Sequence, residues 1–200
     1  MRLRFEGEIA GFGTTSGVRL VLGIWRRTPL GPFADVMVQE AGGHRLLLAP
    51  SAEVATFLQA TYTFDDVRVG EVRLRVDGPR RHLTAPGLDV TVEVGGRTLL
   101  GRVLRLVPRR LATAPGWLRV IDPLARVLLR GVRTRGSAKD GRREFYGAVD
   151  VRRLTAASGR WQGRPLGPLA PVSPPVTFGF GSTPAAPSLT TLVTTIEEGR

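Results

Sequence analysis

The strictest constraint on the fold is an alternation of apolar and polar residues in two stretches of the chain. In residues 72–77 (VRLRVD) and 88–94 (LDVTVEV) every second residue is apolar. A period of two places successive side chains on opposite faces of a strand. Each stretch then has one dry face and one wet face, as in an antiparallel sheet or barrel wall. We therefore expect a mainly β (β-rich α+β) fold: an antiparallel curved sheet, barrel or cone.

Other segments extend this pattern. Residues 18–25 alternate in the same way, and residues 33–40 and 44–50 flank Ala41–Gly43 as the two arms of a hairpin would. Residues 145–156 predict a further strand that ends in a turn near Ser158 and Gly159. The β-branched residues 188–196 predict an edge or closing strand. Ser51 is expected to cap a short helix.

A basic segment, residues 97–143, interrupts the strand rhythm. It holds twelve Arg and Lys139 against two Asp, a net +11, whereas the whole chain is +12. Its apolar residues recur at helical spacing from Leu99, with Thr98 as a cap, although Gly95 and Gly96 are equally compatible with a hairpin. Asp122 and Pro123 predict a second helix start. We expect two or three short amphipathic helices around 98–130, with Leu99, Val103, Leu124 and Leu128 covering the sheet.

Length and composition limit the class of protein. Two hundred residues suit a single domain, 1–200, that includes the basic segment. The chain has no cysteine, which excludes disulfides and thiolate metal sites and fits a reducing compartment. Glu6 and Glu8 stand where a signal peptide needs apolar residues, and no apolar run approaches membrane-spanning length. The expectation is a cytoplasmic protein.

Few residues suggest a catalytic or metal site. His44 and His82 are the only histidines and stand far apart in sequence, so we expect no metal and no cofactor. Asp35 and His44 could face each other across the predicted hairpin, as an acid–base couple or as a plain surface pair. The glycine-rich stretch 11–17 lacks a following helix, which favours a turn over an anion-binding nest.

A candidate anion site lies at the end of the basic segment. Around two glycines stand side chains that could bind a phosphate or carboxylate, namely Arg133, Arg135, Ser137, Arg142 and Arg143. The alternative is a solvated loop with no ligand. Tyr146 and Trp161, further along the chain, either line a ligand cavity or fill the core.

Residues 131–148 (GVRTRGSAKDGRREFYGA) and 174–184 (PPVTFGFGSTP) resemble conserved hypothetical proteins of actinobacteria, a likeness that implies no activity. The many curved strands also resemble lipocalin-type barrels and the cone of acetoacetate decarboxylase. The second resemblance does not extend to chemistry. A Schiff-base decarboxylase needs a buried lysine, and Lys139, the only lysine, stands in a turn rich in Gly and Arg.

These observations support a non-enzymatic binding protein that holds an apolar or amphipathic acidic small molecule inside a β-barrel or cone, with arginines near its mouth. An alternative is an isomerase or hydrolase that uses Asp35, His44 or Tyr146 in the same cavity. Whether the chain is an enzyme stays open at this point.

A third alternative is a basic protein that binds nucleic acid or an anionic membrane surface. The basic segment attracts phosphates, but Trp117 is its only aromatic residue, which disfavours base stacking. Arginines interleaved with Leu and Val also suit an interfacial helix. The expected membrane binding is weak and salt-sensitive, with none to neutral lipid.

Overall fold

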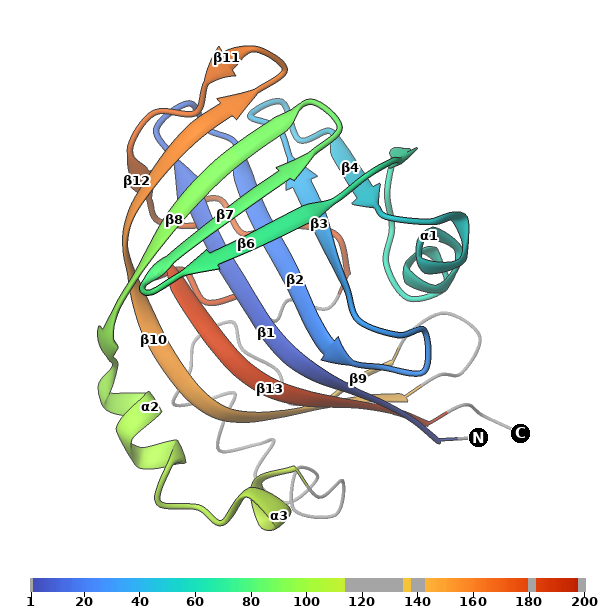
Figure 1. Ribbon diagram of the computed structural model, residues 1–200, viewed down its shortest axis with the longest axis vertical. Coiled ribbons are helices and arrows are strands. Elements are labelled where there is room, and N and C mark those ends of the chain that lie inside the picture. The colour runs from blue at the N-terminus through green and yellow to red at the C-terminus, as the bar shows by residue number, and fades with distance from the viewer. Residues whose placement is uncertain (1, 114–134, 138–142, 180–182, 198–200) are drawn as a thin grey trace.

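The computed structural model describes residues 2–113, 135–137, 143–179 and 183–197, and it confirms the mainly β fold (Figure 1). The strands are β1 (Arg2–Thr14), β2 (Arg19–Arg27), β3 (Phe33–Gln39), β4 (Arg45–Ala49), β5 (Asp66–Val69), β6 (Arg73–Asp77), β7 (Arg80–Ala85), β8 (Leu88–Arg97), β9 (Arg135–Ser137), β10 (Arg143–Trp161), β11 (Arg164–Pro165), β12 (Leu169–Ala170) and β13 (Ser188–Glu197). The helices are α1 (Ala52–Gln59), α2 (Leu99–Leu104) and α3 (Arg109–Ala112).

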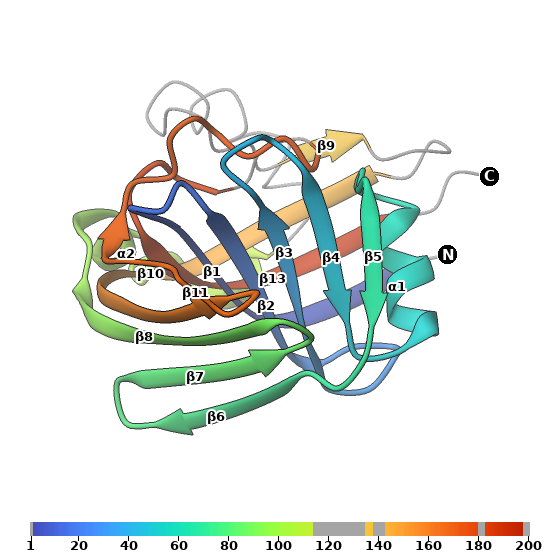
Figure 2. The same ribbon diagram turned by 90° about the horizontal axis from the view of Figure 1, so that it is seen from above.

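All the strands belong to one strongly curled sheet. Its order is β5-β4-β3-β2-β1-β13-β10-β8-β7-β6, and neighbours along it are antiparallel except β4 and β5. The curl brings β6–β8 across from β2–β4 (Figure 2). Leu22 and Val36 from one side therefore share a buried inner core with Leu83 and Val90 from the other.

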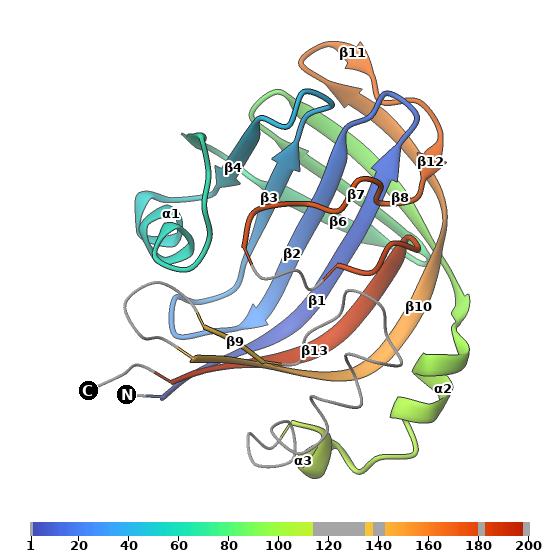
Figure 3. The ribbon, with the colours of Figure 1, turned by 180° about the vertical axis from the view of Figure 1, so that it is seen from behind.

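The outer face of β2–β4 is also covered. Val21, Met37 and Leu47 form a second apolar cluster with Val54 and Leu58 of α1. The chain after β12 crosses the outer face of β1 and β2 (Figure 3). Because both faces are covered, β2 and β3 are buried almost throughout instead of showing one wet face.

Several local predictions are confirmed. Strands β3 and β4 form the expected antiparallel hairpin, in which Gln39 pairs with Arg45. Ser51 caps α1, since its hydroxyl accepts a hydrogen bond from the Val54 amide at 3.2 Å. Thr98 caps α2 in the same way through the Gly101 amide at 3.0 Å, so the helix prevails over a hairpin at this point.

The predicted turn at Ser158 and Gly159 is wrong, because β10 runs through both residues. Gly159 has φ +150°, and a Cβ added there would lie 2.1 Å from the Asp89 carbonyl oxygen of β8. Glycine at this position allows a close approach of two strands. The chain turns later, at Gln162 and Gly163, which both have positive φ. β13 is a central strand, paired with β1 and β10.

The prediction that Leu99 and Val103 cover the sheet is also wrong. Leu99 is 78% exposed, Val103 51% and the nearby Leu106 82%. Helix α2 contacts β10 through Gly101, where a Cβ would lie 2.2 Å from the Val151 carbonyl oxygen. A glycine contact brings the backbones too close for the larger side chains to point inward. Leu124, Leu128 and the predicted helix around them lie outside the described residues.

In the described part of the chain, no helix is long and apolar enough to cross a membrane.

Gly101→Ala should destabilise the fold by roughly 1–2 kcal/mol, because the overpacking cost at Val151 exceeds the helix-propensity gain of alanine. Gly96→Ala is the matched control, since a Cβ there meets nothing within 4 Å. Chemical denaturation of both variants tests this contact. Equal free energies of unfolding for the two variants would show that α2 does not rest on β10 as described.

Candidate functional site

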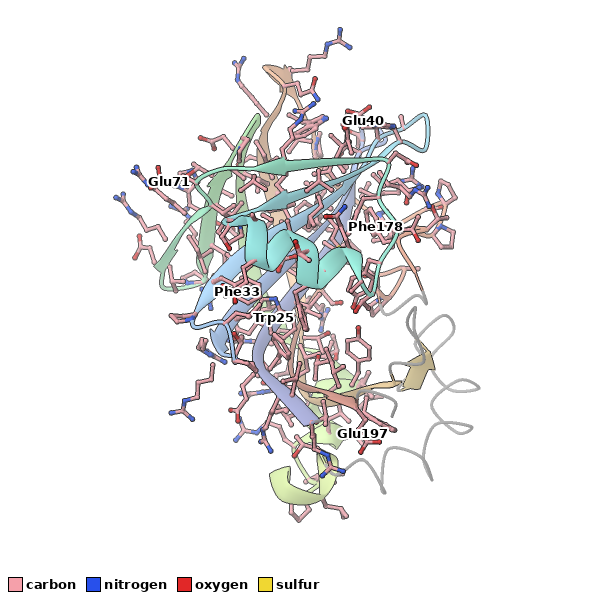
Figure 4. All side chains as sticks on the ribbon, turned by 90° about the vertical axis from the view of Figure 1, so that its right-hand side faces the viewer. Trp25, Phe33, Glu40, Glu71, Phe178 and Glu197 are labelled. Atoms are coloured by element: carbon pink, nitrogen blue, oxygen red, sulfur yellow. The ribbon has the colours of Figure 1, made fainter. Side chains whose placement is uncertain are left out.

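A cavity lies between the outer face of the sheet and the layer that covers it. The sheet contributes residues of β1, β2, β3, β10 and β13, and the cover contributes α1, the residues just after it and Val176–Gly179. The lining comprises Phe5, Ile9, Val21, Gly23, Trp25, Phe33, Asp35, Met37, Phe57, Leu58, Thr61, Tyr62, Tyr146, Val176, Phe178, Gly179, Thr183, Thr194 and Ile196. Figure 4 looks onto α1, with Trp25 and Phe33 on one side of it and Phe178 on the other.

Aromatic contacts and glycines shape this cavity. The Phe5 ring stacks on Phe57 of α1, with centroids 4.9 Å apart, and meets Trp25 edge-on at 5.9 Å. Gly23 forms part of the floor. A Cβ at Gly23 would lie 2.2 Å from Asp35 Oδ1 and 2.6 Å from Trp25 Nε1. Glycine at this position leaves the space that these two side chains need in order to meet.

The cavity has room for a small ligand. Its accessible volume is about 60 Å³. A water molecule takes about 30 Å³ of the liquid, so the cavity admits a molecule larger than a single water. A compound with one six- or seven-carbon ring is a suitable size for a first ligand.

Asp35 is the buried ionisable group of the cavity. Its pairing with Gly23 across β2 and β3 places it on the cavity side, where it is 2% exposed. Trp25 Nε1 donates a hydrogen bond to Oδ1 at 2.9 Å. Burial raises the pKa of Asp35 to about 7, against a smaller lowering effect of the Trp25 hydrogen bond. A carboxyl group with this pKa can donate or accept a proton at neutral pH.

Hydroxyl groups supply the other polar atoms. Tyr62, just after α1, and Tyr146 of β10 are joined by a hydrogen bond between their hydroxyl groups. Thr61 and Thr194 are buried, and their Oγ1 atoms have no hydrogen-bond partner among the described residues. The cavity therefore combines apolar walls with a few hydrogen-bonding groups, the usual composition of a small-molecule site.

The cover is attached to the sheet by buried polar side chains. Gln39 Nε2 donates to Thr177 Oγ1, while the Thr177 amide donates to Gln39 Oε1, both at 2.8 Å. Arg19 donates to the carbonyl oxygens of Pro174 at 3.0 Å and Glu40 at 2.8 Å. These bonds hold the segment that carries Val176 and Phe178 in place over the cavity.

The candidate residues from the sequence fall in different places. Tyr146 lines the cavity. Trp161 lies in the inner core, where its Nε1 donates to Glu40 Oε1 at 2.8 Å. Arg135 and Ser137 belong to β9, and Arg143 begins β10 opposite Ser137. Arg133 and Arg142 lie outside the described residues, as does Lys139.

Asp35 and His44 do not meet. His44 is close to Asp65 and Asp66 at the surface, with ring nitrogen to carboxylate distances of 3.9 and 3.6 Å. Asp65 also forms a two-pronged pair with Arg45, which holds the pKa of the Asp65 carboxyl well below its usual range. His44 therefore belongs to a surface charge cluster. Of the three residues named in the enzyme alternative, only Asp35 and Tyr146 line the cavity.

A second hollow, on β6–β8 and β10, is polar and open. Two of its charged residues pair with a neighbour: Arg80 contacts Glu93 at 2.9 Å, and His82 contacts Asp89, just outside the hollow, at 3.1 Å. Such exposed pairs are typical of a solvated surface. In the described part of the chain, no group of three or more His, Cys, Asp or Glu residues could hold a metal ion.

Comparison with known proteins does not place the chain in a family. The sequence matches no protein-family model and no curated protein. A crystal structure of acetoacetate decarboxylase from Legionella pneumophila subsp. pneumophila is similar, with a TM-score of 0.46 and 11% sequence identity. The alignment covers 98% of this chain and 84% of that one. No residue role is transferred from so distant a likeness.

The Trp25–Asp35 pair was not foreseen from the sequence. The available signal was an acidic residue inside FADVMV, a segment that is otherwise apolar. An acid in a strand with two covered faces must be buried, and buried acids are paired or protonated. The partner could not be read from the sequence, because the register of β2 against β3 decides it.

Asp35→Asn should stabilise the protein at pH 8 far more than at pH 4. Below pH 4 the Asp35 carboxyl is protonated in both the folded and the unfolded chain. Between pH 4 and 7 only the unfolded chain loses this proton, so wild-type stability falls as the pH rises. Asparagine does not titrate. The difference in free energy of unfolding between Asp35→Asn and wild type should therefore grow by on the order of 4 kcal/mol over this range.

Denaturant titrations at several pH values measure this difference. Asp77→Asn, on the exposed strand β6, is the control and should follow the wild-type curve. If the stability of Asp35→Asn changed with pH in the same way as that of wild type, Asp35 would not hold a proton at neutral pH.

Proposed function

We propose that the protein binds a compact, mainly apolar small molecule in the cavity on the outer face of the sheet. The observation that supports this most directly is the cavity itself, with aromatic and aliphatic walls and a buried carboxyl group that faces it. The sequence predicted a ligand site inside the barrel or cone. The inner face is instead occupied by a packed cluster of Leu, Val and Phe side chains. The proposed site is therefore on the opposite face of the same strands.

Toluene is a suitable probe because it matches the size and the apolar walls of the cavity. We expect it to shift the NMR signal of the Trp25 indole N–H, since Trp25 lines the cavity. The Trp161 indole signal is an internal control, because that side chain lies in the inner core. Trp25→Phe assigns the signal.

Filling the cavity should abolish toluene binding. Val21→Phe places a ring in the cavity, and Val69→Phe makes the same change at an exposed position on β5 as the control. We expect toluene to shift the Trp25 indole signal saturably in wild type and in Val69→Phe. It should not shift this signal in Val21→Phe. If toluene does not shift the Trp25 indole signal of the wild-type protein, the cavity is not a binding site.

A second candidate function is docking on an anionic membrane surface. It is favoured by the exposure of Leu99, Val103 and Leu106 beside the exposed Arg102 and Arg105. Apolar side chains that do not cover the sheet are available to enter the lipid boundary, while arginines contact head groups. Each arginine near such a surface contributes about 1 kcal/mol, so the binding should depend on salt.

Cosedimentation with phosphatidylserine vesicles tests this candidate. We expect binding that high salt reverses and none to phosphatidylcholine vesicles. Leu99→Gln with Leu106→Gln should weaken it, as should Arg102→Gln with Arg105→Gln. The control, Val69→Gln with Val76→Gln, changes exposed valines on β5 and β6. Equal binding to both lipids would exclude the proposal.

A further inference from the structure

Three polar groups of the cavity lack a full set of partners. Among the described residues, Trp25 is the only hydrogen-bond partner of the Asp35 carboxyl, and the Oγ1 atoms of Thr61 and Thr194 have none. All three side chains are buried and line the same space. Buried polar groups without partners are costly. The Thr61 and Thr194 hydroxyl oxygens are enclosed by protein atoms, whereas the Asp35 oxygens are not among the enclosed atoms without a partner. Asp35 is therefore the place where a polar atom of a ligand would be stabilised.

The Trp25 hydrogen bond fixes how Asp35 can act. An indole N–H only donates, so it occupies Oδ1 as an acceptor and leaves Oδ2 for the proton and for a further partner. Gly23 beneath this bond has no Cβ that would push the two side chains apart. The hydrogen bond from Trp25 thus orients the carboxyl group relative to the cavity.

No charged side chain in the described lining favours ionisation of Asp35. The other polar residues in the lining all carry hydroxyl groups: Thr61, Tyr62, Tyr146, Thr183 and Thr194. No arginine, lysine or histidine is among them. The protonated carboxyl is consequently the form that the surroundings favour, and burial raises its pKa to about 7.

We propose that the cavity selects a neutral ligand with a carbonyl oxygen, as in a cyclic ketone or a small ester, which accepts a hydrogen bond from the protonated Asp35. This inference rests on the proposed function and specifies the ligand class. A carbonyl oxygen satisfies Oδ2–H without placing any charge in the cavity. An ammonium ligand would require a buried ion pair, whose desolvation cost is high.

Two ring compounds with the same number of heavy atoms separate this inference from plain apolar binding. Cyclohexanone carries a carbonyl oxygen where methylenecyclohexane carries a CH₂ group. We expect cyclohexanone to bind at least tenfold more tightly at pH 5.5, measured from the Trp25 indole signal. The protonated fraction of Asp35 falls about thirtyfold between pH 5.5 and 8.5, so the apparent dissociation constant of cyclohexanone should rise by up to about that factor.

The hydrocarbon is the control, and its affinity should change less than about twofold over the same pH range, because it forms no hydrogen bond with Asp35. Asp35→Asn is the matched variant. Its amide NH₂ can donate to the ketone while its oxygen accepts from Trp25. Cyclohexanone should therefore bind this variant equally at both pH values.

The outcomes distinguish the two proposals. If neither ring compound binds, the proposed function itself fails. If the hydrocarbon binds and the ketone has no advantage, or if the ketone affinity of wild type is independent of pH, only the ligand class is wrong. Tighter binding of cyclohexylamine than of cyclohexanone at pH 8.5 would show a cation site and overturn the inference in the same way.

Discussion

The structure depends on covering both faces of its central strands. β2 and β3 carry apolar side chains on each side, and one sheet can bury only one of those sides by curling on itself. The other side requires α1 and the chain around Thr177, whose Val176 and Phe178 pack on this face. The paired hydrogen bonds between Gln39 and Thr177 hold it there. Because a loop covers part of this face, packing is incomplete and a cavity remains.

Much of the fold could be predicted from the sequence, since alternation and capping are local signals. The hairpin of β3 and β4 and the caps at Ser51 and Thr98 need only neighbouring residues. The errors arose where a distant strand decides the local structure. Ser158 and Gly159 have the composition of a turn, yet Gly159 serves a close approach to β8. Leu99 has the spacing of a core residue, but Gly101 is the contact with β10.

The site was less predictable than the fold. Asp35 and Tyr146 could be named from residue type, but their neighbours come from elements far away in sequence. Tyr146 meets Tyr62 from the end of α1, and Asp35 meets Trp25 only because Gly23 lies between the two strands' side chains. The sequence suggested His44 as the partner of Asp35 because the two residues are close in the chain. The parallel pairing of β4 with β5 instead places it with Asp65 and Asp66, outside the cavity.

A purely structural role explains Asp35 poorly. As an acceptor for Trp25 Nε1, asparagine would serve equally well and would not lose stability at neutral pH. As a space-filling residue, leucine would bury more apolar surface and cost no desolvation. Only a protonated carboxyl group combines three properties: it accepts a hydrogen bond from Trp25, it can donate one toward the cavity, and it loses its proton near pH 7. Those properties matter to a ligand in the cavity, so a residue that destabilises the fold at neutral pH supports the cavity as the binding site that we propose.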